Sequence, residues 1–454
     1  MKSKNLISLL GIVVVLILLQ CVFATKSSAE TKSGNDGAVT WTFDTETGVL
    51  TFSGTGPITT EVYVDDNIVD NVTKKIVIGE GITDIIDKAY LFRNVIEEIE
   101  VDENNQVYAS VDGCLYNKDK SELIYWPRAK GESCVIPNSV TKIGAYAFFV
   151  ASKLKNISIP NTVTEIGEYA FYKCGIKSIV IPDSVTKIDK GAFSCCYALE
   201  NVKLSDGMTV ISQELFQDCY NLKYVELSDN ITSIEDFAFG AMPTIFFGGD
   251  GDGDASDNPT ICPIEIVIPN SIISISEEAF GRMDESYNCI KTTVYCKSDS
   301  TAKKYIDDWN EGHREGLLEY VIDDDAPTIN ISQDGNSIVI DSTDGKGVGL
   351  KKTAYSLDGK NWVENNVIDV NDSGTYTVYV RDKLYNISSK EITIDIIDND
   401  KADNDEDKEP NKTDDSQSDK VIPNTGTRFP IIMIGVLVIA AIAYRNYKKY
   451  NIKM

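Results

Sequence analysis

An internal repeat of about 23 residues runs through the middle of the chain and restricts its fold more than any other feature of the sequence. The segment VTKIGAYAF at Val140–Phe148 recurs as VTEIGEYAF at Val163–Phe171 and as VTKIDKGAF at Val185–Phe193. Six copies have isoleucines 23, 22, 23, 23 and 41 residues apart, each followed five positions later by phenylalanine: Ile143, Ile166, Ile188, Ile211, Ile234 and Ile275. One copy cannot bury its apolar side chains alone, so stacked copies are expected to share a continuous core.

A second apolar pattern, with the spacing L-x-x-I-x-I, lies between the copies. It reads LKNISI from Leu154, IKSIVI from Ile176, LENVKL from Leu199 and LKYVEL from Leu222. This alternation predicts one short strand in each copy, with its apolar side chains pointing inward. Strands of successive copies are expected to pair in parallel about 4.8 Å apart, so that the polar residues between them form one outward face.

These repeats resemble the BspA-like leucine-rich repeat family, whose unit reads roughly L-x-x-I-x-I-P-x-x-V-x-x-I-x-x-x-A-F-x-x-C. The resemblance covers about residues 38–322 and implies a mainly β solenoid of the leucine-rich repeat type, which we expect over residues 74–322. It also implies a β-rich N-terminal cap at residues 30–73 and a β-hairpin insert at residues 102–133. Near the other end, Ser300 is a typical helix N-cap residue and predicts a short capping helix.

The cysteines occupy fixed places in the repeat. Cys174, Cys196 and Cys219 each lie three residues after the phenylalanine of their copy, and Met242 takes that place in the next copy. A position that accepts cysteine or methionine is typical of a small buried apolar slot, so we interpret these thiols as structural. Two pairs remain as disulfide candidates: Cys289 with Cys296, and more weakly Cys114 with Cys134.

The 41-residue step holds an Asp-rich insert at residues 248–260. Asp250, Asp252 and Asp254 alternate like the start of a calcium-binding loop, but Ala255 replaces the expected glycine and no glutamate stands at the twelfth position. These aspartates are weak calcium candidates, and a flexible polar excursion from the solenoid is the alternative. No other metal site and no cofactor are predicted.

An Ig-like β-sandwich is predicted at residues 323–397, after the solenoid. Five short strand-like runs separated by regular turns cover this segment, a spacing typical of β-sandwiches. The run GTYTVYVRD at Gly374–Asp382 resembles bacterial Ig-like surface repeats. Residues 398–421 follow; their ten acidic residues, four lysines and lack of aromatic residues predict a disordered acidic linker.

The two ends of the chain predict export and attachment to a cell surface. Residues 1–29 have a basic start and an apolar run from Leu6 to Leu19, which is typical of a secretory signal peptide. Residues 422–454 contain the sequence IPNTG, an apolar stretch and a basic tail. This order resembles the LPXTG-type cell-wall sorting signal of Gram-positive surface proteins, and a plain C-terminal membrane anchor is the alternative.

The sorting signal implies two partners, sortase and peptidoglycan. In that family sortase cuts between the threonine and glycine of the motif and joins the threonine to peptidoglycan, so the membrane holds the protein only transiently before sorting. The corresponding residues here are Ile422, Pro423, Asn424, Thr425 and Gly426, with isoleucine in place of the usual leucine. We therefore expect a secreted protein anchored to the cell wall.

Composition argues against several classes of function. The chain carries 43 lysines and arginines against 70 aspartates and glutamates, a formal net charge of -27, which opposes binding to nucleic acid. His313 is the single histidine, so a Ser-His-Asp triad, a Cys-His pair or a His-rich zinc site would all depend on it. No motif singles out a pair of carboxylates for glycoside hydrolysis. The chain is therefore predicted not to be an enzyme.

The predicted function is adhesin-like recognition of a host or microbial surface protein or glycan through the solenoid. A structural spacer or coat protein without a specific ligand is the alternative. The candidate binding face consists of outward-pointing strand residues, in which an aromatic residue among charges offers an anchor for a contact. It comprises Lys155, Asn156, Lys177, Glu200, Lys203, Lys223, Tyr224 and Glu226.

Overall fold

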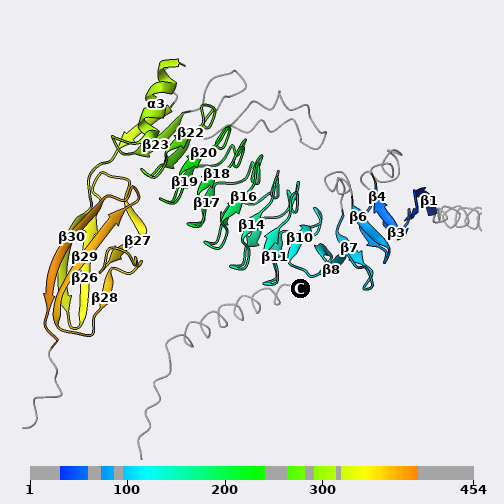
Figure 1. The fold of residues 1–454 in the computed structure, drawn as a ribbon, viewed down its shortest axis with the longest axis horizontal. Coiled ribbons are helices and arrows are strands. Elements are labelled where there is room, and N and C mark those ends of the chain that lie inside the picture. The colour runs from blue at the N-terminus through cyan, green and yellow to red at the C-terminus, as the bar shows by residue number, and fades with distance from the viewer. Residues whose placement is uncertain are drawn as a thin grey trace, which may run out of the picture. The chain divides into compact units, whose positions relative to one another are not determined.

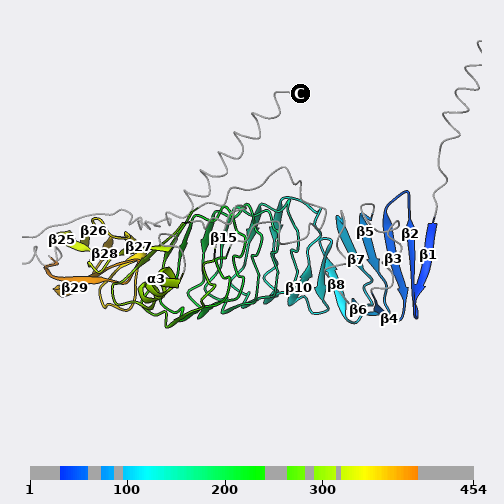
Figure 2. The same ribbon diagram turned by 90° about the horizontal axis from the view of Figure 1, so that it is seen from above.

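The computed structural model describes residues 31–59, 73–85, 96–240, 263–281, 291–312 and 318–396. Figures 1 and 2 show short β-strands almost throughout, with turns that follow one another from β10 to β22. The predicted mainly β solenoid is thereby confirmed. Within these ranges, no helix combines the length and the apolar character needed to cross a membrane.

The N-terminal part is a five-stranded sheet that changes from antiparallel to parallel pairing. Strands β1 (Thr31–Asp36), β2 (Val39–Asp44) and β3 (Val49–Gly54) form an antiparallel meander. Strand β5 (Lys75–Ile78) then pairs in parallel with β3, and β7 (Glu98–Val101) with β5. Beside this sheet, β4 (Gly56–Ile58) pairs in parallel with β6 (Ile82–Ile85). The first strands therefore cap the stack and start its parallel register.

The predicted hairpin insert is a three-stranded antiparallel unit that separates two cores. It contains β8 (Tyr108–Val111), β9 (Cys114–Asn117) and β10 (Glu122–Tyr125). Successive residues of a strand face opposite sides. Accordingly Leu115 and Tyr125 pack in the N-terminal core, whereas Tyr116 and Trp126 pack in the core of the repeats. The insert thus contributes side chains to the end of each of the two cores.

The L-x-x-I-x-I segments form the predicted parallel strands of one wall. The strands are β11 (Ser133–Val135), β13 (Asn156–Ser158), β15 (Ser178–Val180), β17 (Asn201–Lys203), β19 (Tyr224–Glu226), β21 (Ile264–Val267), β23 (Thr292–Cys296) and β24 (Leu318–Ile322). Equivalent residues of successive copies lie opposite each other, for example Val202 opposite Val225. The central residue of β15, β17 and β19 is buried, and both residues beside it point outward.

A second wall is built from two-residue strands around the repeated isoleucine. They are β12 (Lys142–Ile143), β14 (Glu165–Ile166), β16 (Lys187–Ile188), β18 (Val210–Ile211), β20 (Ser233–Ile234) and β22 (Ser274–Ile275). The first three continue in parallel from β10, and the last three form a separate parallel sheet. The sequence analysis predicted one strand in each copy, and it did not predict the strands of this second wall.

The repeated phenylalanines stack in an unbroken row through the core. Ring centroids are 4.8 Å apart for Phe148 and Phe171, 4.9 Å for Phe171 and Phe193, and 5.8 Å for Phe193 and Phe216. The row continues through Phe239 and Phe280, and each of these phenylalanines is at most 2% exposed. Because every ring contacts the rings of both neighbouring turns, this row ties the copies together.

The cysteines of the repeat are buried thiols, as predicted. The Sγ of Cys196 lies 2.9 Å from the carbonyl oxygen of Phe171, and that of Cys219 lies 3.1 Å from the oxygen of Phe193. Burial raises the pKa of Cys174 to about 12, so this thiol stays protonated and unreactive. Cys114 and Cys134 are also free, which corrects the weaker of the two disulfide candidates. Cys296 is free as well, and Cys289 lies outside the described residues.

The predicted capping helix is α3 (Thr301–Gly312). The Ser300 hydroxyl accepts a hydrogen bond of 3.1 Å from the Lys303 amide, which is the expected N-cap interaction. Ala302 and Ile306 are buried against the repeats, and the Tyr305 ring lies 5.8 Å from that of Phe280. The helix therefore covers the last phenylalanine of the row.

Residues 328–394 form two three-stranded antiparallel sheets around a small apolar core. One sheet contains β25 (Thr328–Asp334), β26 (Ser337–Thr343) and β28 (Val367–Asp369). The other contains β27 (Leu350–Ser356), β29 (Gly374–Asp382) and β30 (Ile387–Ile394). Ile338, Ile340, Val378, Val380 and Ile394 fill the core between them. The Ig-like assignment of this unit stays a prediction.

Candidate functional site

The outward face of the first wall carries the residues that were predicted to bind a ligand. Two of its lysines are neutralised by acids of the preceding turn. The Lys155 Nζ lies 2.7 Å from an oxygen of Glu132, and the Lys223 Nζ lies 2.7 Å from an oxygen of Glu200. The same contact lowers the pKa of Glu200. Exposed pairs of this kind add little stability, but they leave the face less basic than its lysines suggest.

Tyr224 does not stand free among these charges. The ammonium of Lys383, from the turn between β29 and β30, lies 4.9 Å from the centre of its ring. The Tyr224 hydroxyl contacts Glu226 at 3.4 Å, and burial raises the pKa of this tyrosine. Glu226 in turn lies 3.6 Å from the Nζ of Lys351. Both Tyr224 and Glu226 therefore contact lysines of the C-terminal sandwich.

The remaining predicted residues occupy three different positions of the repeated strand segment. Asn156 and Lys177 are exposed, and the Asn156 side chain contacts the Ser133 hydroxyl at 3.5 Å. Lys203 is exposed and lies between Val180 of the preceding strand and Glu226 of the next. Asp250, Asp252 and Asp254 and the sorting residues 422–426 lie outside the described residues, so they stay predictions.

The strand ladder of this face is interrupted between β13 and β15. Strand β13 pairs with β11, and β15 with β17, but the two are not paired with each other. The interruption falls in the copy with the 22-residue step, where Ile176 follows Cys174 by two positions instead of three. Gly175 occupies this shortened turn, and a Cβ there would lie 2.0 Å from the carbonyl oxygen of Ser152. Glycine is therefore required at this close approach.

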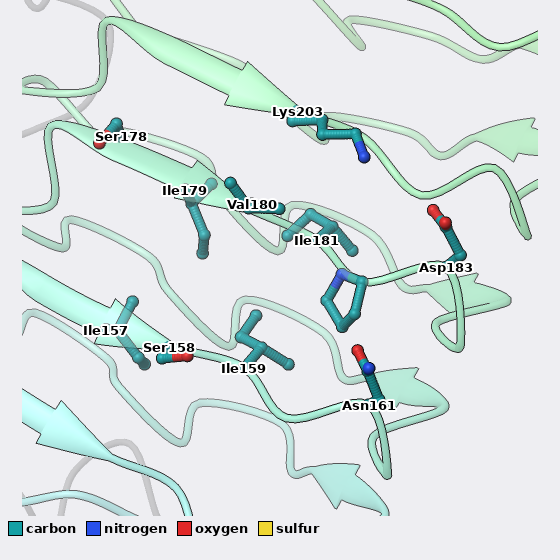
Figure 3. A pocket seen from close by; sticks show the side chains of 11 residues that line it. Ile157, Ser158, Ile159, Asn161, Ser178, Ile179, Val180, Ile181, Asp183 and Lys203 are labelled. Carbon is teal, nitrogen blue, oxygen red and sulfur yellow. The ribbon is translucent and has the colours of Figure 1, made fainter. Parts of the chain in front are cut away.

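An open hollow of about 470 Å³ lies over the interruption (Figure 3). Its walls come from three successive turns and combine apolar side chains with hydroxyls, one amide, one carboxylate and one ammonium group. The lining residues are Ile157, Ser158, Ile159, Asn161, Ser178, Ile179, Val180, Ile181, Pro182, Asp183 and Lys203. Lys203 was predicted as part of the binding face, whereas the hollow itself was not. The 22-residue step was the signal in the sequence that could have located it.

A cluster of three carboxylates was also missed by the sequence analysis. Asp323, Asp344 and Asp382 each place one oxygen within 4.8 Å of the others. Asp382 accepts hydrogen bonds from Asn386, and Asp323 accepts one of 2.8 Å from the Val348 amide. The Oδ1 of Asp344 is buried without a partner among the described residues. Carboxylate oxygens are the ligands that calcium prefers, so these residues form the group best suited to a cation in the described part of the chain.

Burial and the neighbouring carboxylates raise the pKa values of Asp382 and Asp344. The pKa of Asp382 is raised to about 6, mainly because the side chain is buried and further because Asp344 and Asp323 are close. The pKa of Asp344 is raised by burial and by Asp323. A raised acid pKa means that the folded state holds a proton that the unfolded state has lost. The contribution of Asp382 to stability is therefore greatest below its ordinary pKa of 3.8 and declines until the pH passes about 6.

Asp344→Asn is expected to stabilise the sandwich at pH 7 by about 1 kcal/mol, because it removes one charge of the cluster and lowers the pKa of Asp382. The decline in stability between pH 4 and pH 6 should become shallower. Chemical denaturation across this pH range, with and without a chelator, measures both effects. Asp341→Asn, an exposed aspartate of β26, is the matched control and should change neither. An unchanged pH profile in Asp344→Asn would show that the three carboxylates do not interact.

Comparisons with known proteins found one matching family model and several similar solved structures. A family model described as "BspA type Leucine rich repeat region" matches residues 121–245 in six copies. Among solved structures, the pneumococcal vaccine antigen PcpA is 21% identical, with a TM-score of 0.41 and 56% of each chain covered. A leucine-rich repeat protein from Eubacterium ventriosum is 21% identical, with a TM-score of 0.36, over 56% of this chain and 95% of the other.

A leucine-rich repeat protein of T. pallidum is 18% identical, with a TM-score of 0.28, over 46% of this chain and 95% of the other. The chain thus spans about half the length of PcpA and nearly all of the two smaller proteins. No curated protein matches the chain. Residues 121–245 are therefore similar to the BspA-type leucine-rich repeat region.

Proposed function

We propose that this protein is a cell-wall-anchored surface protein that recognises an extracellular protein or glycan through the outward face of its solenoid. The observation that carries the proposal is the hollow over the interruption between β13 and β15. Concave sites lined by apolar side chains and a few polar groups are the usual form of a small-ligand site. The rest of the solenoid is a rigid stack that holds this site in place.

The chemistry of the face favours recognition over catalysis. Among the described residues, the acids along the strands are exposed or half-buried, and several are paired with lysines, as Glu200 is with Lys223. The cluster at Asp323, Asp344 and Asp382 lies at the sandwich, away from the hollow in the chain, and its oxygens are partly bonded to neighbouring amides. Neither arrangement offers an activated nucleophile or a positioned acid and base.

The proposed location rests on the two ends of the chain. The signal peptide and the IPNTG segment with its apolar stretch and basic tail support export followed by covalent attachment to peptidoglycan. A protein attached there meets host and microbial surfaces. Recognition of such a surface, by a protein or glycan contact, is therefore the function that we propose.

An array of glycans and extracellular proteins tests the proposal. The purified full-length chain is expected to bind a small set of related molecules, and bacteria that display it should bind the same set. A chain that only forms a spacer or coat should bind nothing above the level of an unrelated acidic protein. Binding of every anionic molecule on the array in proportion to its charge would also contradict specific recognition.

A further inference from the structure

We propose that the hollow between β13 and β15 binds a carboxylate-bearing sugar unit, with Lys203 as the partner of the carboxylate. This inference rests on the proposed function and assigns its ligand class. The hollow holds about 470 Å³, within the range of roughly 300–1,000 Å³ that is usual for small-ligand sites. Its size therefore fits a terminal sugar of a glycan rather than the surface of a folded protein.

The first argument is the charge of Lys203. Lys155 and Lys223, on the same face, each lie 2.7 Å from an acid of the preceding turn. At the corresponding place before Lys203 stands Val180, which is 61% exposed. Lys203 forms no ion pair with any described residue, so its charge at the rim of the hollow is available to an anion.

The polar lining matches the hydroxyl groups of a sugar. Ser158 and Ser178 each offer a hydroxyl that can donate and accept, and Asn161 offers an amide with both functions. Asp183 adds a carboxylate, one oxygen of which accepts a hydrogen bond of 3.1 Å from the Asp206 amide. A sugar ring carries several hydroxyls that also donate and accept, so this lining can satisfy them from two sides. Figure 3 shows these groups arranged around the opening.

The backbone and the apolar lining complete the match. Strands β13 and β15 both contribute residues to the hollow and are not paired with each other, so the backbone groups on their facing edges have no partner in a strand ladder. Val180 and Pro182 supply an apolar surface beside the polar groups. A sugar ring presents C–H groups on one face and hydroxyls at its edge, which is the same combination.

The test uses one pair of ligands that differ only in charge. The first is a tetrasaccharide of alternating glucuronate and N-acetylglucosamine; the second is the same molecule with its carboxylates reduced to alcohols. Calorimetric titration of the purified full-length chain should show binding of the first and at least tenfold weaker binding of the second. Binding of the acidic form should weaken as salt is raised, because salt screens an exposed charge.

Two variants locate the site. Lys203→Gln should weaken binding of the acidic tetrasaccharide about tenfold or more and remove the preference for it over the reduced form. Lys153→Gln, at an exposed lysine of the solenoid that neither lines the hollow nor belongs to the predicted binding face, is the matched control and should bind as the unchanged chain does. Ser158→Trp, which fills the hollow from an exposed position, should abolish binding of both forms. Melting curves establish that each variant is folded.

The outcomes separate this inference from the proposed function. The array could yield ligands whose binding is unaffected by Lys203→Gln and Ser158→Trp. That result would agree with surface recognition but would show that the hollow is not the binding site. Preference for an aspartate-containing peptide over the acidic tetrasaccharide, lost in Lys203→Gln, would keep the site but overturn the sugar assignment. An array without any ligand would overturn the proposed function, and equal binding of both tetrasaccharides would overturn the role of Lys203.

Discussion

Replacing Phe193 with alanine is expected to lower the free energy of unfolding by about 3–5 kcal/mol, as for other fully buried phenylalanines. The Phe193 ring is 0% exposed and stacks on Phe171 at 4.9 Å and on Phe216 at 5.8 Å. Both neighbours are held by rings of their own next turns, so they cannot move to fill the cavity. Denaturant melts of the full-length chain, followed by tryptophan fluorescence and circular dichroism, measure the loss.

Tyr197→Ala is the control for this substitution, because Tyr197 also stacks on the next turn but is 37% exposed. Its loss should be clearly smaller, since less apolar surface leaves water on folding. In a solenoid each turn contacts only its neighbours, so hydrogen exchange should increase first in the turns next to residue 193. A loss below about 1 kcal/mol for Phe193→Ala would contradict a continuous aromatic row.

The aromatic row and the first parallel wall were predictable because both follow from a period. Each copy places its phenylalanine five residues after an isoleucine, and stacking in register is the way to bury all of them together. The same reasoning located the buried thiols, whereas the capping helix was predicted from Ser300 as its N-cap residue. In these elements local pattern and global fold require the same residues, so one copy predicts the next.

The strands of the second wall and the interruption between β13 and β15 were harder to predict from the sequence. A strand of two residues such as Lys142–Ile143 has no alternation from which a pattern can be recognised, and it forms only because the stack places it beside its equivalent in the next copy. The interruption does correspond to a feature of the sequence, since the step from Ile166 to Ile188 is 22 residues instead of 23. Its consequence depends on how the shortened turn at Gly175 packs against Ser152, which the repeat pattern does not contain.

The remaining features that the sequence did not predict depend on contacts between segments that are distant in the sequence. Lys383 lies over Tyr224 although 159 positions separate them in the sequence, so the outward pattern of β19 could not reveal that its tyrosine is engaged. The carboxylates of Asp323, Asp344 and Asp382 come from three separate segments and meet only in the folded chain. Periodicity specifies which side of a strand a residue occupies; it does not specify what else packs on that side.

Replacing Thr425 with alanine is expected to move nearly all of the protein from the cell-wall fraction to the membrane and the medium. In the sorting signal that the C-terminal residues resemble, the threonine is joined to peptidoglycan, so its replacement removes the point of attachment. The apolar stretch after Arg428 and the basic tail remain, so the chain should still pause in the membrane during export. Immunoblots of wall, membrane and medium fractions measure the distribution.

Thr427→Ala is the matched control, because this threonine lies two residues further along and outside the IPNTG segment. It should leave the wall fraction unchanged. Ile422→Leu, which restores the usual first residue of the motif, should attach at least as well as the unchanged chain if the same sortase processes both. Wall attachment of Thr425→Ala at the normal level would remove the sorting hypothesis and favour a plain membrane anchor. In that case recognition by the solenoid would still be open to the array test, because it depends on the hollow rather than on how the chain is held.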